Sequence, residues 1–380
     1  MKWEKVRLGD VADSCLGKML DQEKNRGEYQ PYLANVNVRW GSFDLENLPQ
    51  MRFLESEEDR YGLKYGDLIV CEGGEPGRCA IWKEQVPNMK FQKALHRVRV
   101  HNNVDYRYLF YWFLFAGKRG ALDQYFTGAT IKHMPGDKLK SIILDLPPLE
   151  QQKKIADVFS AYDDLIENNQ KQIKLLEEAA QRLYKEWFID LRFPGHQSTP
   201  IVNGFPEGWI MGTLGQIAEF KRGKTITKAQ VIPGVVPVVA GGLEPAYYHN
   251  TANTKAPVIT VSGSGANAGF TKMYHIDVFA SDCSFADSTT TSYLGYVFCV
   301  MQSAKEKLRK MQKGSAQPHV YAKDINALSV LIPDRLILES FCKIVSQLFE
   351  RIGMLEAQNI RLAEARDCLL PKLMHGELEV

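Results

Sequence analysis

The chain has 380 residues, of which 45% are hydrophobic and 24% are charged, the composition of an ordinary soluble globular protein. This length predicts two or three domains and excludes a single small core. The 47 basic and 45 acidic side chains give a formal net charge of only +2, which by itself does not indicate a nucleic-acid partner.

The sequence contains no apolar run of about 18 residues, the length that a membrane-spanning helix needs. The first ten residues, MKWEKVRLGD, also lack the apolar segment of a signal peptide. We therefore expect a cytoplasmic protein with no membrane partner. Its 7 cysteines form no CxxC pair, so neither a zinc ribbon nor a disulfide framework is predicted, and no metal site is expected.

In chain order, short apolar runs predict strands and a few longer stretches predict helices, so the fold class is mixed α/β. Strands are expected at 68–71, 98–100, 142–146, 258–261, 278–280 and 296–300, and short helices at about 104–117 and 302–313. The dense aromatic residues between Tyr106 and Phe115 favour a packed core over a platform for stacking bases.

The chain contains an internal repeat, which indicates two copies of one structural unit. At a single constant offset the matches are Trp3 with Trp209, Leu8 with Leu214, Gly9 with Gly215, Ala12 with Ala218, Gly17 with Gly223, and Lys18 with Lys224. At a second, shorter offset Gly128 matches Gly314 and His133 matches His319. We interpret the Gly…His pattern as a repeated element of the fold in preference to a base-reading motif.

A long helix with heptad spacing follows each copy. The apolar positions of the first helix are Ile155, Phe159, Ile166, Ile173, Leu176 and Leu183, with Asn169 as its polar position. Those of the second are Val345, Leu348, Ile352, Leu355, Leu362 and Leu369, with Asn359 and Arg366 as its polar positions. A buried Asn costs stability but fixes register when a partner amide satisfies it. The matched pattern predicts an antiparallel coiled coil, although one such helix could also lie on its own domain.

These patterns divide the chain into five segments. They are a first domain (1–150), a first helix (151–191), a linker rich in Pro, Gly and polar residues (192–208), a second domain (209–335) and a second helix (336–380).

No catalytic motif is complete in the sequence. Asp145–Leu149 (DLPPL) has one residue too many, and no aromatic residue, for the loop of an amino-methyltransferase. Gly223-Lys224-Thr225 ends like a phosphate-binding loop, but Ala218 stands where that loop needs its first glycine. The Gly-rich segment Ser262–Gly269 fits a tight turn better than a dinucleotide loop. The residues present therefore do not favour an enzyme.

Four strings, in this order, resemble the specificity subunits of Type I restriction-modification systems over essentially the whole chain. They are LEQQKKI (149–155), LLEEAAQRLYKEWF (175–188), FPEGW (205–209) and LLPKLMHGEL (369–378). The resemblance implies two similar target recognition domains, each reading one half of a bipartite, asymmetric site in double-stranded DNA. It also implies that the helices act as a spacer and dock modification (methyltransferase) subunits, two of them, through which restriction (helicase-nuclease) subunits join. S-adenosylmethionine is then expected on the modification subunits, and no cofactor on this non-catalytic chain.

Candidate DNA-contacting residues follow from the chemistry of phosphate and base contacts. The repeated Gly-Lys pairs favour phosphate contact by Lys18, Arg222 and Lys224. The Gly-rich turns 72–78 (EGGEPGR) and 262–269 add further base or backbone contacts. The alternation of polar and apolar side chains in residues 90–93 also predicts a surface that faces a DNA groove. These additional candidates are Arg78, Lys90, Gln92, Arg97, Ser264 and Asn267.

Two alternatives remain open at this stage. One is a methyltransferase or nuclease fused to recognition domains, which would need a catalytic motif. The other is a coiled-coil scaffold that carries two protein-binding modules.

Overall fold

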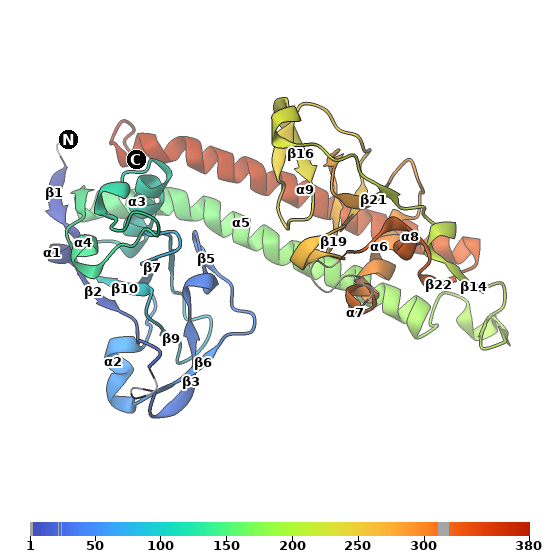
Figure 1. The fold of residues 1–380 in the computed structure, drawn as a ribbon, viewed down its shortest axis with the longest axis horizontal. Coiled ribbons are helices and arrows are strands. Elements are labelled where there is room, and N and C mark those ends of the chain that lie inside the picture. Colours follow the sequence, from blue (N-terminus) through green and yellow to red (C-terminus); the bar gives the residue numbers. More distant parts are fainter. Residues whose placement is uncertain (1–2, 22, 24, 311–318) are drawn as a thin grey trace. The chain divides into compact units, whose positions relative to one another are not determined.

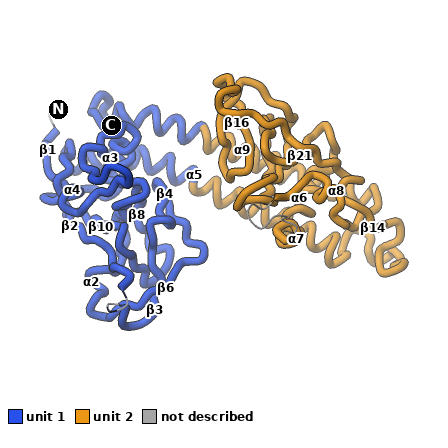
Figure 2. Tube along the Cα trace, viewed as in Figure 1, with its two compact units in different colours: residues 1–166, 361–380 blue, residues 167–360 orange. Residues whose placement is uncertain are grey.

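The computed structural model describes residues 3–21, 23, 25–310 and 319–380. The chain forms two compact units: unit 1 comprises residues 1–166 and 361–380, and unit 2 comprises residues 167–360 (Figure 2). Each unit therefore contains one copy of the repeat and a part of each long helix. Among the described residues, no helix is both long and apolar enough to cross a membrane.

Unit 1 is built from a strand pair and two small sheets (Figure 1). The pair joins β1 (Glu4–Arg7) and β11 (Ile143–Leu146). The four-stranded sheet has the order β2 (Ala12–Leu16), β10 (Leu95–Val100), β7 (Leu68–Cys71), β8 (Cys79–Ile81). The three-stranded sheet has the order β6 (Gln50–Phe53), β3 (Glu28–Leu33), β9 (Lys90–Phe91). Contacts between β3 and β9 are parallel, and the other pairs of these sheets are antiparallel.

Unit 2 repeats this strand pair and these two sheets in the same strand order, which confirms the internal repeat. Its strand pair joins β14 (Ile210–Thr213) and β22 (Ser329–Ile332). Its four-stranded sheet has the order β15 (Lys221–Arg222), β21 (Cys283–Asp287), β18 (Val258–Ser262), β19 (Thr271–Tyr274). Its three-stranded sheet has the order β17 (Tyr247–His249), β16 (Pro233–Val239), β20 (Phe279–Ala280). The β16–β20 contact is parallel, like its counterpart β3–β9.

Short elements connect these strands. They are α1 (Leu8–Val11), α2 (Glu58–Tyr61), α4 (Gly136–Lys140), α7 (Lys305–Lys310), α8 (Ala322–Asn326), β4 (Val38–Arg39), β5 (Ser42–Phe43), β12 (Ile201–Val202) and β13 (Phe205–Pro206). The strands expected at 68–71, 98–100, 142–146, 258–261 and 278–280 are confirmed within a residue or two, apart from the longer β10.

Each unit carries one buried helix, α3 (Tyr106–Lys118) in unit 1 and α6 (Leu294–Ser303) in unit 2. The aromatic residues of α3 lie mostly in the core of unit 1, which confirms the core interpretation. The strand expected at 296–300 is wrong, because those residues belong to α6. A helix that is apolar on all sides shows no periodicity that separates it from a buried strand. The helix expected at 302–313 is confirmed in part by α7 (Lys305–Lys310), while residues 311–318 lie outside the described chain.

The two long helices are α5 (Leu149–Tyr184), which continues into a π-helical turn (Lys185–Ile189), and α9 (Arg335–Met374). Within unit 1, Ile155 and Phe159 of α5 are fully buried in one core with Leu370 and Leu373 of α9. Closer to the middle of both helices, Arg366 Nη1 lies 2.5 Å from Asp163 Oδ1. Residues later in α5 therefore contact residues earlier in α9, so these helical segments are antiparallel.

The same antiparallel pairing occurs within unit 2. The Asn169 side chain, 5% exposed, donates from Nδ2 to Asn359 Oδ1 at 2.9 Å, so the predicted amide pair forms. Tyr184, near the end of α5, packs its ring against Phe341, near the start of α9. Other predicted heptad residues are also buried or partly buried in the core of unit 2: Ile173, Leu176, Leu183, Val345, Leu348 and Ile352. Leu355 is buried as well. Ile166, Leu362 and Leu369 belong to unit 1 and are half-buried.

Candidate nucleic-acid interface

The repeated Gly-Lys pair has the same backbone role in both units. The Lys18 N–H donates to the Phe91 carbonyl at 3.1 Å, and the Lys224 N–H donates to the Ala280 carbonyl at 3.0 Å. A Cβ on the preceding glycine would lie 2.3 Å from a backbone oxygen in unit 1 and 2.4 Å in unit 2. Only glycine permits this close approach to β9 and β20, so the repeat preserves a packing requirement.

The two lysine side chains nevertheless differ. Lys18 is 2% exposed, and its Nζ lies 2.5 Å from Glu57 Oε2 and 2.9 Å from the Arg52 carbonyl. Its ammonium also lies 4.9 Å from the centre of the Phe53 ring. The expected exposure of Lys18 to a phosphate is therefore wrong, because these groups enclose the ammonium. Lys224 is exposed, as its assignment requires.

Two further candidates of unit 1, one on β9 and one on β10, are buried. Lys90 is 0% exposed, with Nζ 2.8 Å from Glu58 Oε2. Arg97 is 7% exposed and donates from Nη1 to the carbonyls of Asp59 and Arg60 at 3.1 and 3.0 Å. The expectation that both line an open groove-facing surface is wrong: each holds the segment around α2 against the sheet. Gln92 is half-buried, and its role stays a prediction.

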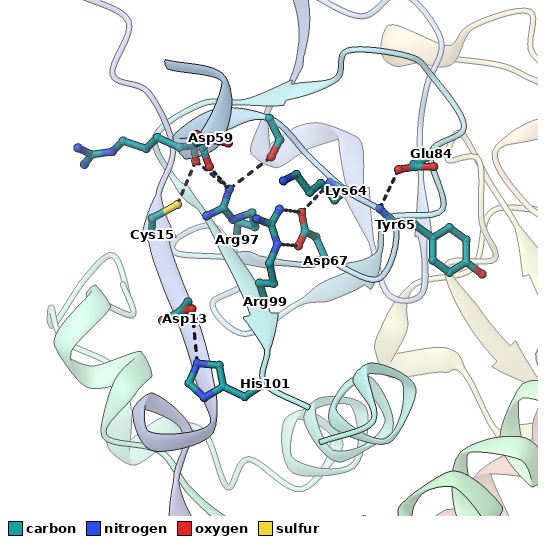
Figure 3. Close-up of polar contacts among 12 residues, drawn as sticks. Asp13, Cys15, Asp59, Lys64, Tyr65, Asp67, Glu84, Arg97, Arg99 and His101 are labelled. Atoms are coloured by element: carbon teal, nitrogen blue, oxygen red, sulfur yellow. Dashed lines mark hydrogen bonds and ion pairs between the residues drawn. The ribbon is translucent and has the colours of Figure 1, made fainter. Parts of the chain in front are cut away.

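Two basic residues that follow Arg97, Arg99 on β10 and His101 just after it, are not among the candidates predicted from the sequence (Figure 3). The three residues lie at alternate positions along extended chain and so point to one face of the sheet. Arg99 is 31% exposed and forms a bidentate pair with Asp67, with two N–O distances of 2.7 Å. Hydrogen bonding to Asp67 raises the pKa of Arg99. His101 is 43% exposed, and its Nε2 lies 3.4 Å from Asp13 Oδ2. The signal was the alternation in HRVRVH (96–101).

The loop 72–78, between β7 and β8, is held by Arg78. Its Nη1 donates to Glu75 Oε2 at 2.9 Å, and its Nη2 donates to Asn35 Oδ1 at 3.2 Å. The Arg78 side chain is only 18% exposed. These contacts make Arg78 an anchor of the loop, whereas Glu75, at its tip, is 53% exposed.

The equivalent loop of unit 2 follows β18 and carries different side chains. The Ser264 hydroxyl donates to Asp282 Oδ2 at 2.6 Å, and Arg222 Nη2 lies 3.4 Å from Asp282 Oδ1. Asn267 Nδ2 donates to the Gly241 carbonyl at 3.4 Å. The Arg222 side chain is 66% exposed, so its guanidinium is accessible to a ligand.

Both loops contact the repeated histidine through the backbone. His133 forms an isolated antiparallel bridge with Gly73, and His319 forms one with Ser264. The Gly…His motif therefore positions the Gly-rich loops, which confirms the interpretation as a fold element for the two histidines. Gly314, the glycine of the second motif, lies outside the described residues.

Among residues 3–21, 23, 25–310 and 319–380, no group of three His, Cys, Asp or Glu side chains could hold a metal ion. Burial raises the pKa of the thiols of Cys71 and Cys342 to about 11 and that of Cys283 to about 12, so these thiols stay protonated at neutral pH.

Comparisons with known proteins agree with this geometry. A family model described as "Type I restriction modification DNA specificity domain" matches residues 1–178 and 206–364. The Type I restriction enzyme MjaIX specificity subunit of Methanocaldococcus jannaschii is 30% identical over 348 residues, which cover 83% of this chain and 78% of that protein. The Type I restriction enzyme HindI specificity subunit of Haemophilus influenzae is 22% identical over 330 residues, which cover 66% of this chain and 72% of that protein.

The fold is shared with a crystal structure of the S subunit of a Type I restriction-modification system from M. genitalium. The TM-score is 0.57 at 19% identity, with 98% of this chain and 96% of that chain covered. From the family model and the M. jannaschii relative, the chain belongs to the specificity subunits of Type I restriction-modification systems. It is a non-catalytic subunit that recognises DNA sequence, which excludes the fused enzyme.

Proposed function

We propose that this chain reads a bipartite, asymmetric site in double-stranded DNA, one half with each unit, and that its paired helices separate the halves. The observation that carries this proposal is that one fold occurs twice with unlike side chains on equivalent loops. Glu75 and Arg78 occupy the loop of unit 1, whereas Ser264 and Asn267 occupy that of unit 2. A shared scaffold with different loops supports two different half-sites.

The helices also dock two modification subunits in this proposal, and restriction subunits join through those. S-adenosylmethionine binds to the modification subunits, which carry out adenine methylation. At about 1.5 Å per residue, the 36 residues of α5 span about 54 Å, enough to reach half-sites about 34–36 Å apart, one turn of B-DNA.

Inserting one heptad into each helix tests the spacer role. The insertion points are between Ile166 and Glu167 in α5 and between Ile360 and Arg361 in α9, where unit 1 meets unit 2 in the chain. Insertion there leaves the contacts within each unit intact. Seven residues add about 10.5 Å, so the spacer between half-sites should lengthen by about three base pairs while both half-site sequences stay the same. Methylome sequencing of cells that express the altered system reads the site directly.

An insertion in only one of the two helices is the matched control, and it should abolish modification because the helical segments no longer align. An unchanged spacer after the double insertion contradicts the proposal. So does saturable binding of S-adenosylmethionine by the purified chain alone.

Arg222 and Lys224 are the exposed cations that best suit phosphate contact. Replacing both by Ala should weaken binding equally for cognate and unrelated duplexes, because phosphates carry no sequence information. The slope of log K against log salt should become shallower by about 0.9 for each phosphate that is no longer neutralised. Titrations between about 50 and 200 mM salt measure this slope. A changed sequence preference with an unchanged slope refutes the assignment.

A further inference from the structure

The Glu75 carboxylate is a fixed and half-exposed hydrogen-bond acceptor at the tip of the loop 72–78. The Trp40 indole Nε1 donates to Glu75 Oε1 at 2.7 Å, and Arg78 Nη1 donates to Glu75 Oε2 at 2.9 Å. Each carboxylate oxygen has two lone pairs, so both retain acceptor capacity. With 53% of the side chain exposed, this capacity is open to an external donor.

The backbone of this loop is held in place as well. Asn35 Nδ2 donates to the Gly73 carbonyl at 2.7 Å. Gly74 and Gly77 have φ values of +75° and +87°, which bulkier residues rarely adopt. The acceptor is therefore preorganised, and binding a partner costs little conformational entropy.

Glu75 also lines a surface hollow of about 490 Å³ in unit 1, together with Trp40, Ile131 and Lys132. The hollow gives a flat group room to approach the carboxylate from outside. Arg78 neutralises the Glu75 charge locally, which reduces its repulsion by the phosphates of DNA. A carboxylate held in this way is suited to a base edge and not to the DNA backbone.

We propose that Glu75 is a specificity-determining residue that reads an amino group in the major groove of the first half-site, the N4 amino group of cytosine. This inference rests on the proposed function. Among the bases, cytosine presents only a donor at that edge, which matches an acceptor-only carboxylate. Trp40 and Arg78 act as positioning residues. In the equivalent loop of unit 2, residues 262–269 include no carboxylate, so this loop has no direct counterpart of Glu75.

The substitution Glu75→Gln tests the proposal, because it keeps the size of the side chain and replaces one accepting oxygen by a donor, with loss of the hydrogen bond from Trp40 or from Arg78. A Gln amide pairs with both N6 and N7 of adenine, so one base pair of the first half-site should change from C·G to A·T. Discrimination at that pair should shift by about ten- to a hundred-fold. The second half-site should not change. The readout is sequencing of duplexes selected from a randomised pool by the full chain assembled with its modification subunits.

Trp40→Phe keeps an aromatic ring but removes the indole donor. It should relax the preference at the same base pair without creating a new one. Glu55→Gln is the matched control, since it removes an exposed carboxylate of unit 1 that lies outside both the loop 72–78 and the long helices, and it should leave the site unchanged. Thermal unfolding of each variant shows whether the fold is retained.

The outcomes separate the two proposals. If the native assembly selects a bipartite site and Glu75→Gln selects the same one, Glu75 does not read a base, and the proposed function stands. If the native assembly selects no sequence, the proposed function fails. If folded Glu75→Gln alters the second half-site, the assignment of Glu75 to the first half-site is wrong.

Discussion

Lys18→Met is expected to destabilise unit 1 by about 3–5 kcal/mol, the cost of breaking a buried ion pair by removing one partner. Met has nearly the length of Lys but cannot satisfy the Glu57 carboxylate or the Arg52 carbonyl, which both accept from Lys18 Nζ. Glu57 is itself only 24% exposed, so water replaces the ammonium poorly. Urea unfolding monitored by circular dichroism measures the loss.

The repeat supplies the matched control for this prediction. Lys224 occupies the equivalent backbone position but is exposed, so Lys224→Met should change the unfolding free energy by less than about 0.5 kcal/mol. The prediction fails if Lys18→Met unfolds at the same urea concentration as the unsubstituted protein but binds every duplex more weakly. Lys18 would then contact phosphate, and its side chain would not be buried in the DNA-bound protein.

Phe341→Ala is expected to destabilise unit 2 by about 3–5 kcal/mol. The Phe341 ring of α9 is 0% exposed and packs against the end of α5, the π-helical turn that follows it, and α6. Its centroid lies 4.9 Å from that of Phe188, 5.7 Å from that of Trp187 and 6.1 Å from that of Tyr296. Truncation leaves a cavity that these large rings cannot close. The loss should appear in thermal unfolding followed by the near-ultraviolet signal of the aromatic residues.

Leu336→Ala serves as the comparison on the same helix, because Leu336 is 70% exposed and should cost little. Equal effects for the two substitutions would show that the aromatic cluster does not hold α9 against α5 in unit 2.

The repeat and the long helices were predictable because regular spacing determines them. The amide pair Asn169–Asn359 followed from the one Asn in each heptad pattern. The fate of Lys18 and Lys224 was not predictable, since their local sequences match. What buries Lys18 is Glu57, which a distant segment of unit 1 supplies. Lys90 and Arg97 were misjudged for the same reason, as their acceptors lie around α2.

Glu75 illustrates the same limit for a candidate functional residue. The string EGGEPGR indicated a turn, and Arg78 was the obvious choice for DNA because of its charge. The structure reverses these roles, since Arg78 is mostly enclosed and Glu75 is exposed. The deciding contact comes from Trp40, which no local pattern connects to the loop. Three-dimensional packing, and not residue type, separates the anchor from the group that it presents.

Unit 1 is made of two chain segments that are far apart in the sequence, which has a consequence for the order of folding. Its core includes Leu370, Leu373 and Met374 from the end of the chain, whereas unit 2 is one continuous segment. During synthesis, unit 2 has all of its residues before the last part of unit 1 leaves the ribosome. Unit 1 must wait, with Ile155 and Phe159 of α5 unprotected, until that segment arrives. The domain translated first is thus the last to mature, which makes this stage of biogenesis the most open to chaperones and aggregation.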